Sequence, residues 1–314
     1  MLKVIKHIDV QGKEGKIISK AISDVITEFD KRANVKGLKR LDVYVTKSPV
    51  KVCRQILFPA KKLNVKTHGE MREWVCGNRP NFSYWEKGKT PVIFLNANEK
   101  IFTTRNYDAI KGLFAHELMH LLNKLDGVEA TLFEELENVA RRMFIILDKH
   151  KEVKPFTIDR LFVSMTRVNS TSSLYIKDIL ANTRAMAFGF DNELFENYKS
   201  VLSDTKNLNY TEQNIIKSLK RDKKHILDDA FLAYLGLNMT WISFKMFENK
   251  RWKELYKLAT FRVPIVIKKN ADPILDSMMA LRSSKDRKII NKLLTSTLDN
   301  YYKIVKYYCN KLSD

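Results

Sequence analysis

The residues best suited to chemistry are two histidines four positions apart, with a glutamate directly after the first: His116, Glu117 and His120. Residues four apart on an α-helix lie on one face, about 6 Å apart along its axis. Two imidazoles placed in this way can bind one Zn²⁺, and the glutamate can reach a water at the metal. The same spacing also suits two histidines that make ordinary hydrogen bonds on a half-buried helix face. Because the chain has only 6 histidines in 314 residues, a chance match is uncommon, and the spacing favours a metal site.

The surrounding sequence predicts that this motif lies on a helix that follows a strand. The short apolar segment 91–96 is bounded by Pro and Asn, which is typical of a strand. Thr and Asn side chains at 103–106 can cap a helix start. Apolar residues then recur at helical spacing from Ile110 to Leu125, and Gly127 can end the helix.

The segment 114–122, Phe-Ala-His-Glu-Leu-Met-His-Leu-Leu, resembles the active-site helix of zincin metallopeptidases. The resemblance implies that His116 and His120 bind zinc, and that Glu117 takes a proton from water and passes it to the leaving amine. Zinc lowers the pKa of a bound water toward roughly 7, and a carboxylate can act as general base and then as general acid. The implied activity is zinc-dependent hydrolysis of peptide bonds in a peptide or protein substrate.

A catalytic zinc site takes a third protein ligand, for which Asp178 is favoured. The segment 177–185 resembles the second motif of gluzincins related to the CAAX prenyl protease and heat-shock membrane protease group, Glu-x-x-Ala-Asp-x-x-Ala. Asp178, Ala181 and Ala185 match it, with Asp in place of the ligand Glu and Asn182 in place of the Asp that orients a zinc-bound His. The shorter Asp requires a closer helix, which the small alanines permit. The alternative is an exposed Asp near the start of a helix predicted at 174–190, where it suits the helix dipole.

Four other acidic residues compete for the third position: Asp126, Glu134, Glu135 and Glu137. The three glutamates lie at about the distance at which some gluzincins take their third ligand, but acidic residues early in a helix also suit its dipole. Asp126 lies where a metzincin places its third ligand, yet the apolar pattern continues past the position where that helix would have to break.

Three further residues are candidates for the site without a motif to support them. Tyr175 and Arg184 flank the proposed ligand helix. His225 lies in a Lys-rich segment and can donate to an oxyanion if folding brings it to the metal. An ordinary surface position is the simpler interpretation of His225.

Composition predicts a folded, cytoplasmic protein. A hydrophobic content of 45% excludes a disordered chain. Three widely spaced cysteines, Cys53, Cys76 and Cys309, predict a reducing compartment with no disulfide. The N-terminus has no apolar signal core, and no run of about 18 apolar residues predicts a membrane span. This differs from the gluzincins above, which are often membrane-embedded.

The formal net charge of +20 allows weak binding of polyanions. The densest basic cluster is Lys217, Lys220, Arg221, Lys223 and Lys224. The alternative function is therefore a non-catalytic protein with a zincin fold that binds nucleic acid or a ribonucleoprotein. Solvated helix faces explain the same lysines without any partner.

The order of predicted elements indicates a helix-rich α+β fold. Residues 1–150 are expected to form a zincin-like α/β lobe that carries the histidine motif, and residues 151–314 a mostly helical lobe that carries the third ligand, with the substrate in a cleft between them. Strands are predicted at 4–10, 41–46, 82–85 and 92–95. Separate helices are predicted at 157–167 and 174–190. In zincins an extended peptide adds to a sheet edge near the active-site helix, and the region 82–95 is the expected edge.

Overall fold

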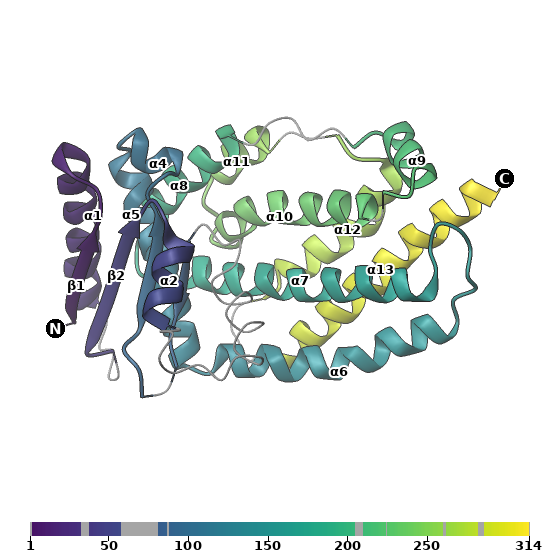
Figure 1. Cartoon of the computed structure of the whole chain (residues 1–314), viewed down its shortest axis with the longest axis horizontal. Coiled ribbons are helices and arrows are strands. Elements are labelled where there is room, and N and C mark those ends of the chain that lie inside the picture. The colour runs from purple at the N-terminus through teal and green to yellow at the C-terminus, as the bar shows by residue number, and fades with distance from the viewer. Residues whose placement is uncertain are drawn as a thin grey trace. The chain divides into compact units, whose positions relative to one another are not determined.

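The structure is a computed structural model that describes residues 2–32, 38–57, 81–86, 88–204, 210–223, 225–259, 262–281 and 286–313. These residues are mainly helical and include one small mixed sheet, which confirms the predicted helix-rich α+β class (Figure 1). The chain divides into two compact units: residues 1–125 with 184–200, and residues 126–183 with 201–314. A domain is a part of the chain that can fold alone, which is more than compactness. The predicted division into domains at residue 150 therefore stays a prediction.

The sheet of the first unit contains four described strands: β1 (Lys3–Ile8), β2 (Arg40–Thr46), β3 (Phe82–Tyr84) and β4 (Val92–Asn96). Their order is β1-β2-β4-β3, with β1, β2 and β4 parallel and β3 antiparallel to β4. The predicted pairing of the strands at 82–85 and 92–95 is confirmed. Because β3 follows β4 at the end of this order, it is at the edge of the sheet among the described strands.

Helices on both faces of the sheet bury its strands. The helix α1 (Gly12–Arg32) connects the parallel strands β1 and β2. The Lys6 ammonium of β1 donates hydrogen bonds to two hydroxyls of α1, to Ser19 Oγ at 2.9 Å and to Ser23 Oγ at 2.6 Å. Tyr44, Phe94 and Phe82 share the opposite face of the sheet, where their rings stack in a row. The helix α2 (Pro49–Leu57) packs Cys53 against this row. The short helix α4 (Lys100–Thr103) follows β4.

The helix α5 (Tyr107–Leu125) carries the histidine motif and is held between α1 and α8 (Asp191–Asp204). The ammonium of the buried Lys111 lies 2.7 Å from a carboxylate oxygen of Glu193 and 3.3 Å from one of Glu28. Although burial lowers it, the hydrogen bond to Glu193 keeps the pKa of Lys111 above its ordinary value. Gly112 lies against the carbonyl oxygen of Glu193 and leaves no room for a Cβ atom. A charge cluster and a close backbone contact therefore fix the position of α5 within this unit.

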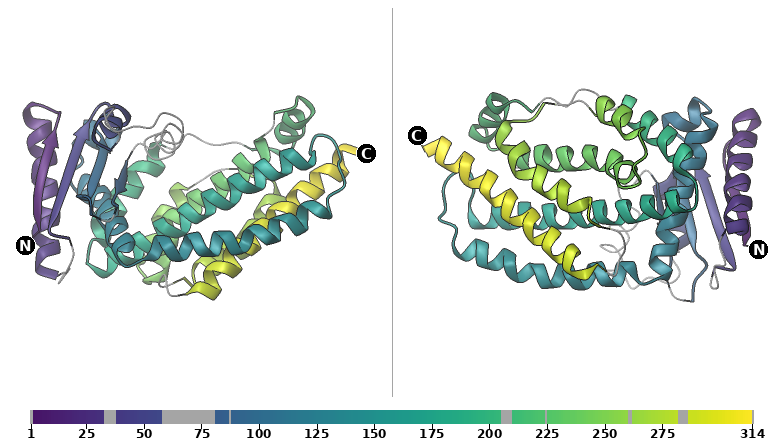
Figure 2. Two further views of the ribbon diagram at one scale, coloured as in Figure 1. Left: turned by 60° about the horizontal axis from the view of Figure 1, so that its bottom comes forward. Right: turned by 180° about the vertical axis from the view of Figure 1, so that it is seen from behind.

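The second unit is built from helices: α6 (Val128–Asp148), α7 (Ile158–Ala187), α9 (Glu212–Lys220), α10 (Ile226–Met246), α11 (Trp252–Leu258), α12 (Ile265–Met278) and α13 (Arg287–Ser313). Figure 2 shows α13 crossing the long helices obliquely, and its contacts are with α6, α10 and α12. Arg142 of α6 makes a two-pronged ion pair with Asp299 of α13, at 2.8 and 3.0 Å. The last residues of α7, from Arg184 on, belong to the first unit.

The prediction of two helices at 157–167 and 174–190 is wrong, because α7 runs without a break from Ile158 to Ala187. The polar run Asn-Ser-Thr-Ser-Ser at 169–173 suggested a loop. In the structure Ser170 Oγ donates to the Arg167 carbonyl at 3.1 Å, and Ser173 Oγ donates to the Ser170 carbonyl at 2.6 Å. These hydroxyls find partners within the helix itself, and the buried side chains of Val168 and Ser172 lie against the core. Packing thus overrides the weak helix propensity.

The cysteines differ from expectation. Cys53 is disulfide-bonded and Cys309 is a free, buried thiol, while Cys76 lies outside the described residues. The sequence favoured a reducing compartment with no disulfide framework, and it did not predict the bond at Cys53. Widely spaced cysteines were a poor guide, because folding rather than spacing decides which thiols meet.

We predict that Gly112→Ala destabilises the protein. In an unobstructed helix this change would stabilise by about 1 kcal/mol, because Ala is the better helix former. Here the added Cβ overlaps the Glu193 carbonyl oxygen, and overpacking of this kind costs about 1–3 kcal/mol. Urea denaturation measures the difference, and a variant more stable than the parent would contradict the contact.

Candidate metal centre

The two histidines of the motif point their side chains at the same place. His116 and His120 lie one turn apart on α5, and both side chains are half-buried. Their Nε2 atoms are 3.0 Å apart, and their rings are nearly perpendicular, at 87° with centroids 4.6 Å apart. The predicted placement of both residues on one helix face is confirmed.

This distance has two physical interpretations. Two neutral imidazoles can share one proton in a hydrogen bond, which requires one ring to present N–H and the other a lone pair. Two lone pairs can also converge on one ion. Zn–N bonds of about 2.0–2.1 Å at a tetrahedral angle separate two nitrogens by roughly 3.3 Å, close to the observed 3.0 Å. The pair therefore fits a metal with little rearrangement.

Glu117 is the most buried acidic group of α5, with 6% of its surface exposed. Its neighbours in the sequence, Ala115, Leu118 and Met119, are apolar and buried. Glu117 has an interaction partner in the fold, which offsets the cost of burying a carboxylate. A buried carboxylate directly after a ligand-type histidine is a candidate for acid–base chemistry.

The edge strand β3 contacts α5 within the same unit. The Lys124 ammonium lies 5.1 Å from the centre of the Tyr84 ring, and the Tyr84 hydroxyl donates to Glu86 at 3.0 Å. Burial, together with the hydrogen bond to Glu86, raises the pKa of Tyr84 to about 12. The contact between the Tyr84 ring and Lys124 therefore links the end of β3 to the histidine helix.

Asp178 lies in the second unit, about two thirds of the way along α7. Its side chain is half-buried, and Asn182, one turn later on the same face, is fully buried. Since α7 begins at Ile158, Asp178 is far beyond the first turn. The helix-dipole explanation for this Asp, which depended on a helix starting near residue 174, is therefore wrong.

Tyr175 is engaged with α10. Its hydroxyl donates to the Leu232 carbonyl at 2.9 Å, and burial raises its pKa, with a further contribution from the Asp178 charge. Gly236 lies against this hydroxyl, where a Cβ would be 2.8 Å from the oxygen. The absence of a side chain at Gly236 thus leaves room for the Tyr175 hydroxyl.

Arg184 is part of the first unit and contacts the histidine helix. Its guanidinium donates to Asn123 Oδ1 at 3.2 Å, and Asn123 is buried one turn after His120. The predicted ligand helix therefore ends in a contact with α5.

The competing acidic residues have other surroundings. Glu134 pairs with Arg287 of α13 at 2.7 Å. Glu135 is buried and accepts from Asn291 at 2.8 Å. Glu137 and Asp126 are exposed. The side chains of Glu134 and Glu135 therefore connect α6 to α13 within the second unit.

His225 directly precedes α10, and its Nδ1 lies 3.3 Å from a carboxylate oxygen of Asp228. Asp228 has no exposed surface and also pairs with Arg167 at 2.7 Å. Burial raises the pKa of Asp228 and outweighs the opposing effect of Arg167. The sequence analysis did not find this ion-pair cluster, whose one signal is the Asp-Asp pair at the helix start. The oxyanion role of His225 stays a prediction.

No family model, curated protein or solved structure matches this chain. Within the described ranges, no helix combines the length and the apolar character needed to cross a membrane.

We predict that Gly236→Ala destabilises the protein by about 1–2 kcal/mol, because the new Cβ pushes on the Tyr175 hydroxyl. In a Tyr175→Phe background the same change should cost less, since the obstructing oxygen is gone. A double-mutant cycle of unfolding free energies measures the coupling. Additive costs would show that the hydroxyl is not the obstacle.

Proposed function

We propose that this protein is a zinc-dependent peptidase that hydrolyses peptide bonds, with His116 and His120 as metal ligands and Glu117 as the general base. The observation that carries the proposal is the 3.0 Å approach of the two Nε2 atoms on a helix that also buries a glutamate. A metal site with an adjacent proton acceptor would use both features.

Asp178 is the proposed third ligand. Among the described residues, His116, His120 and Asp178 are a group that can hold a metal ion. Two nitrogens and one carboxylate oxygen are a ligand set that suits catalytic zinc. Asp178 is half-buried about two thirds of the way along a long helix, away from the ends where capping or the helix dipole favours an Asp. The rival residues Glu134 and Glu135 are occupied by partners on α13.

Zinc held by these residues would supply a Lewis acid that lowers the pKa of water to about 7 and polarises the substrate carbonyl. The chain's own contribution is proton transfer. The Glu117 carboxylate accepts a proton from the attacking water and returns it to the leaving nitrogen as the C–N bond breaks. Asn182 lies one turn from Asp178 and can accept the outer N–H of a ligating imidazole, which would fix its tautomer.

The substrate is proposed to bind as an additional strand on β3. This strand is at the edge of the sheet and contacts α5. Pairing through the main chain provides affinity that does not depend on sequence, so that side-chain pockets select the substrate.

Binding of a polyanion is the rival proposal. Lys217, Lys220, Arg221 and Lys223 are all exposed, and Lys224 lies outside the described residues. Exposure suits nucleic acid and bulk water equally well, so it does not favour a nucleic-acid function over the peptidase. A cytoplasmic location is likewise proposed from the sequence alone, and the disulfide at Cys53 is a feature more typical of oxidising compartments.

We predict that Glu117→Gln abolishes hydrolysis but leaves zinc bound. The amide cannot accept the water's proton, and loss of a general base costs about 10²–10⁴-fold in rate. Cleavage of a proteome-derived peptide library, followed by mass spectrometry, measures the activity, and metal analysis measures the zinc.

Glu137→Gln is the matched control, because this exposed glutamate should tolerate the change with full activity. Normal cleavage by the Glu117 variant would exclude the mechanism. Salt-sensitive RNA binding by a parent protein that lacks peptidase activity would favour the rival.

We predict that the parent binds one zinc per chain, that His120→Ala loses it, and that Asp178→Asn weakens it. An amide is a poorer zinc ligand than a carboxylate, so we expect affinity to fall by about 10-fold or more. Competition with a fluorescent chelator measures the dissociation constant. Asp126→Asn tests the exposed rival and should bind zinc like the parent. If that variant weakens binding and Asp178→Asn does not, the ligand assignment is wrong.

A further inference from the structure

An exposed apolar face lies on α6 and α7 of the second unit and is here called the α6–α7 face. Its exposed large apolar side chains are Phe133, Phe144, Ile145, Ile158, Phe162 and Val163. The rings of Phe144 on α6 and Phe162 on α7 contact each other, with centroids 6.3 Å apart, so the two helices share the face. Exposed apolar clusters of this kind mark interaction surfaces.

The exposure of this face is high for apolar residues. Phe133 and Phe144 have 63% and 60% of their surface exposed, and Val163 has 52%. Because water disfavours apolar surface, such residues gain most when a partner buries them. Aromatic side chains are also enriched in the buried centre of protein–protein interfaces. The α6–α7 face therefore suits a protein partner.

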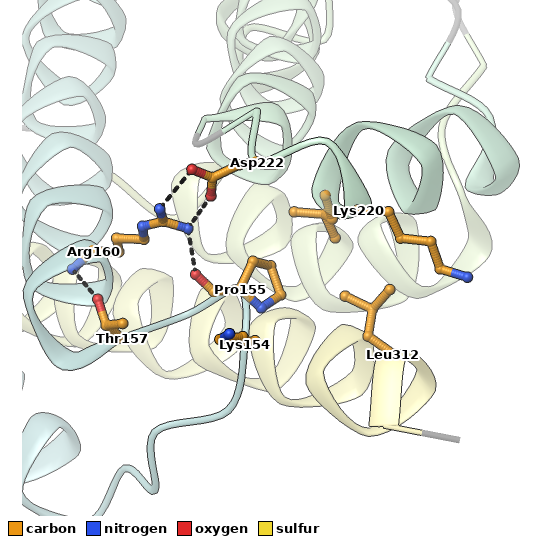
Figure 3. Close-up of a pocket in the computed structure, with 8 residues that line it drawn as sticks. Lys154, Pro155, Thr157, Arg160, Lys220, Asp222 and Leu312 are labelled. Atoms are coloured by element: carbon orange, nitrogen blue, oxygen red, sulfur yellow. Dashed lines mark hydrogen bonds and ion pairs between the residues drawn. The ribbon is translucent and has the colours of Figure 1, made fainter.

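The part of the face on α7 is held in place by hydrogen bonds of the chain itself. Arg160 donates to an Asp222 carboxylate oxygen at 2.8 Å and to the Pro155 carbonyl at 2.8 Å, as Figure 3 shows. These bonds fix the start of α7, where Ile158 and Phe162 lie. The face is therefore formed before a partner arrives, which lowers the entropic cost of binding.

The exposed residues along α6 follow a symmetric pattern. Phe133, Glu137, Arg141 and Phe144 lie within about 80° of one another around the helix axis, so they form one stripe. Glu137 and Arg141 are at equal distances from residue 139, and Phe133 and Phe144 are at equal distances from a point half a residue earlier. Read in the reverse direction, the stripe again runs aromatic, charge, charge, aromatic, with the two charges exchanged.

The two charged residues of the stripe are available to a partner. Glu137 and Arg141 are both exposed. Although residues four apart on a helix can pair, no ion pair or hydrogen bond engages either side chain within the ranges that the structure describes. The stripe is also neutral, whereas the whole chain carries a formal charge of +20. Two copies of the chain therefore repel each other least where these stripes meet.

We propose that two copies of this chain associate through the α6–α7 face, with their α6 helices antiparallel about a two-fold axis near residue 139. In a two-fold interface residue i of one copy contacts residue j of the other, and j contacts i. This register places Glu137 opposite Arg141 of the partner subunit, and Phe133 opposite Phe144 of the partner subunit. Every contact forms twice. A different partner protein gives no reason for a stripe that complements itself.

Sedimentation velocity of the full chain, from about 1 to about 200 µM, measures the association. We expect a reversible dimer with twice the chain mass of 36.7 kDa. A chain that stays monomeric over this range, or one that forms open-ended assemblies, would overturn the proposal. The α6–α7 face contains no residue of the proposed metal centre, so peptidase activity and dimerisation are separate readouts.

Charge reversal tests the register. Glu137→Arg and Arg141→Glu should each raise the dimer dissociation constant about five-fold or more, because each places two like-charge pairs across the axis. Both changes in one chain should restore the parental value. A mixture of the two single variants should form a heterodimer tighter than either homodimer, since every cross-axis pair is then attractive. Pairing within one helix predicts no such preference, so equal affinities of homodimers and heterodimer would overturn the proposed pairing.

Phe144→Asp tests the apolar part of the face and should weaken the dimer by about 100-fold or more, because it places a charge in the buried centre of the interface. Since Phe144 is exposed, the variant should keep the parental circular dichroism and melting temperature. Phe247→Asp is the matched control, because Phe247 is an exposed Phe at the end of α10, and it should dimerise like the parent. If Phe247→Asp disrupts the dimer and Phe144→Asp does not, the copies meet at another face and the proposal is wrong.

Discussion

The convergence of two imidazole nitrogens on one point is the interaction on which the functional interpretation of this protein depends. It requires that α5 keep its register and its rotation, because a turn of one residue would move each ring by about 100° around the helix axis. The fixed features of the first unit supply that constraint. Gly112 lies against the backbone of α8, and Lys111 is held by two carboxylates. Rigid support of this kind is what a metal site needs, since its ligands must hold their geometry closely.

The residues proposed for the site are polar groups in the interior of helices. Glu117 is a largely buried acid on α5, and Asn182 is an amide with no exposed surface on α7. Asp178 is a poor helix former within a long helix. Each of the three has an interaction partner in the fold, which offsets the cost of burying it. Polar residues of low helix propensity are expected where function imposes the residue type.

Predictability differed among the elements for identifiable reasons. The helix that includes Ile110 to Leu125 and the strands at 82–95 follow from periodic apolar residues, which are a local signal, and both occur as predicted. The continuity of α7 does not follow from local preference. Its serine-rich run resembles a loop in composition, yet it is helical, and Val168 and Ser172 within it have no exposed surface. The disulfide at Cys53 was not predicted, because the spacing of cysteines in the sequence does not show which thiols are close together in the folded chain.

The amino-acid order is sufficient to place His116, Glu117 and His120 on one helix, because the spacing of four residues and the helical period are both local properties. It also identifies Asp178 as a possible ligand. It does not exclude Glu134 or Glu135, which have the same chemistry and a comparable position along the chain. In the folded chain these two have partners on α13, more than 150 residues away, and Asp178 has an interaction partner as well. The sequence determines the residue types and the helical period of the apolar residues. The packing of the helices decides which partner each charged group contacts.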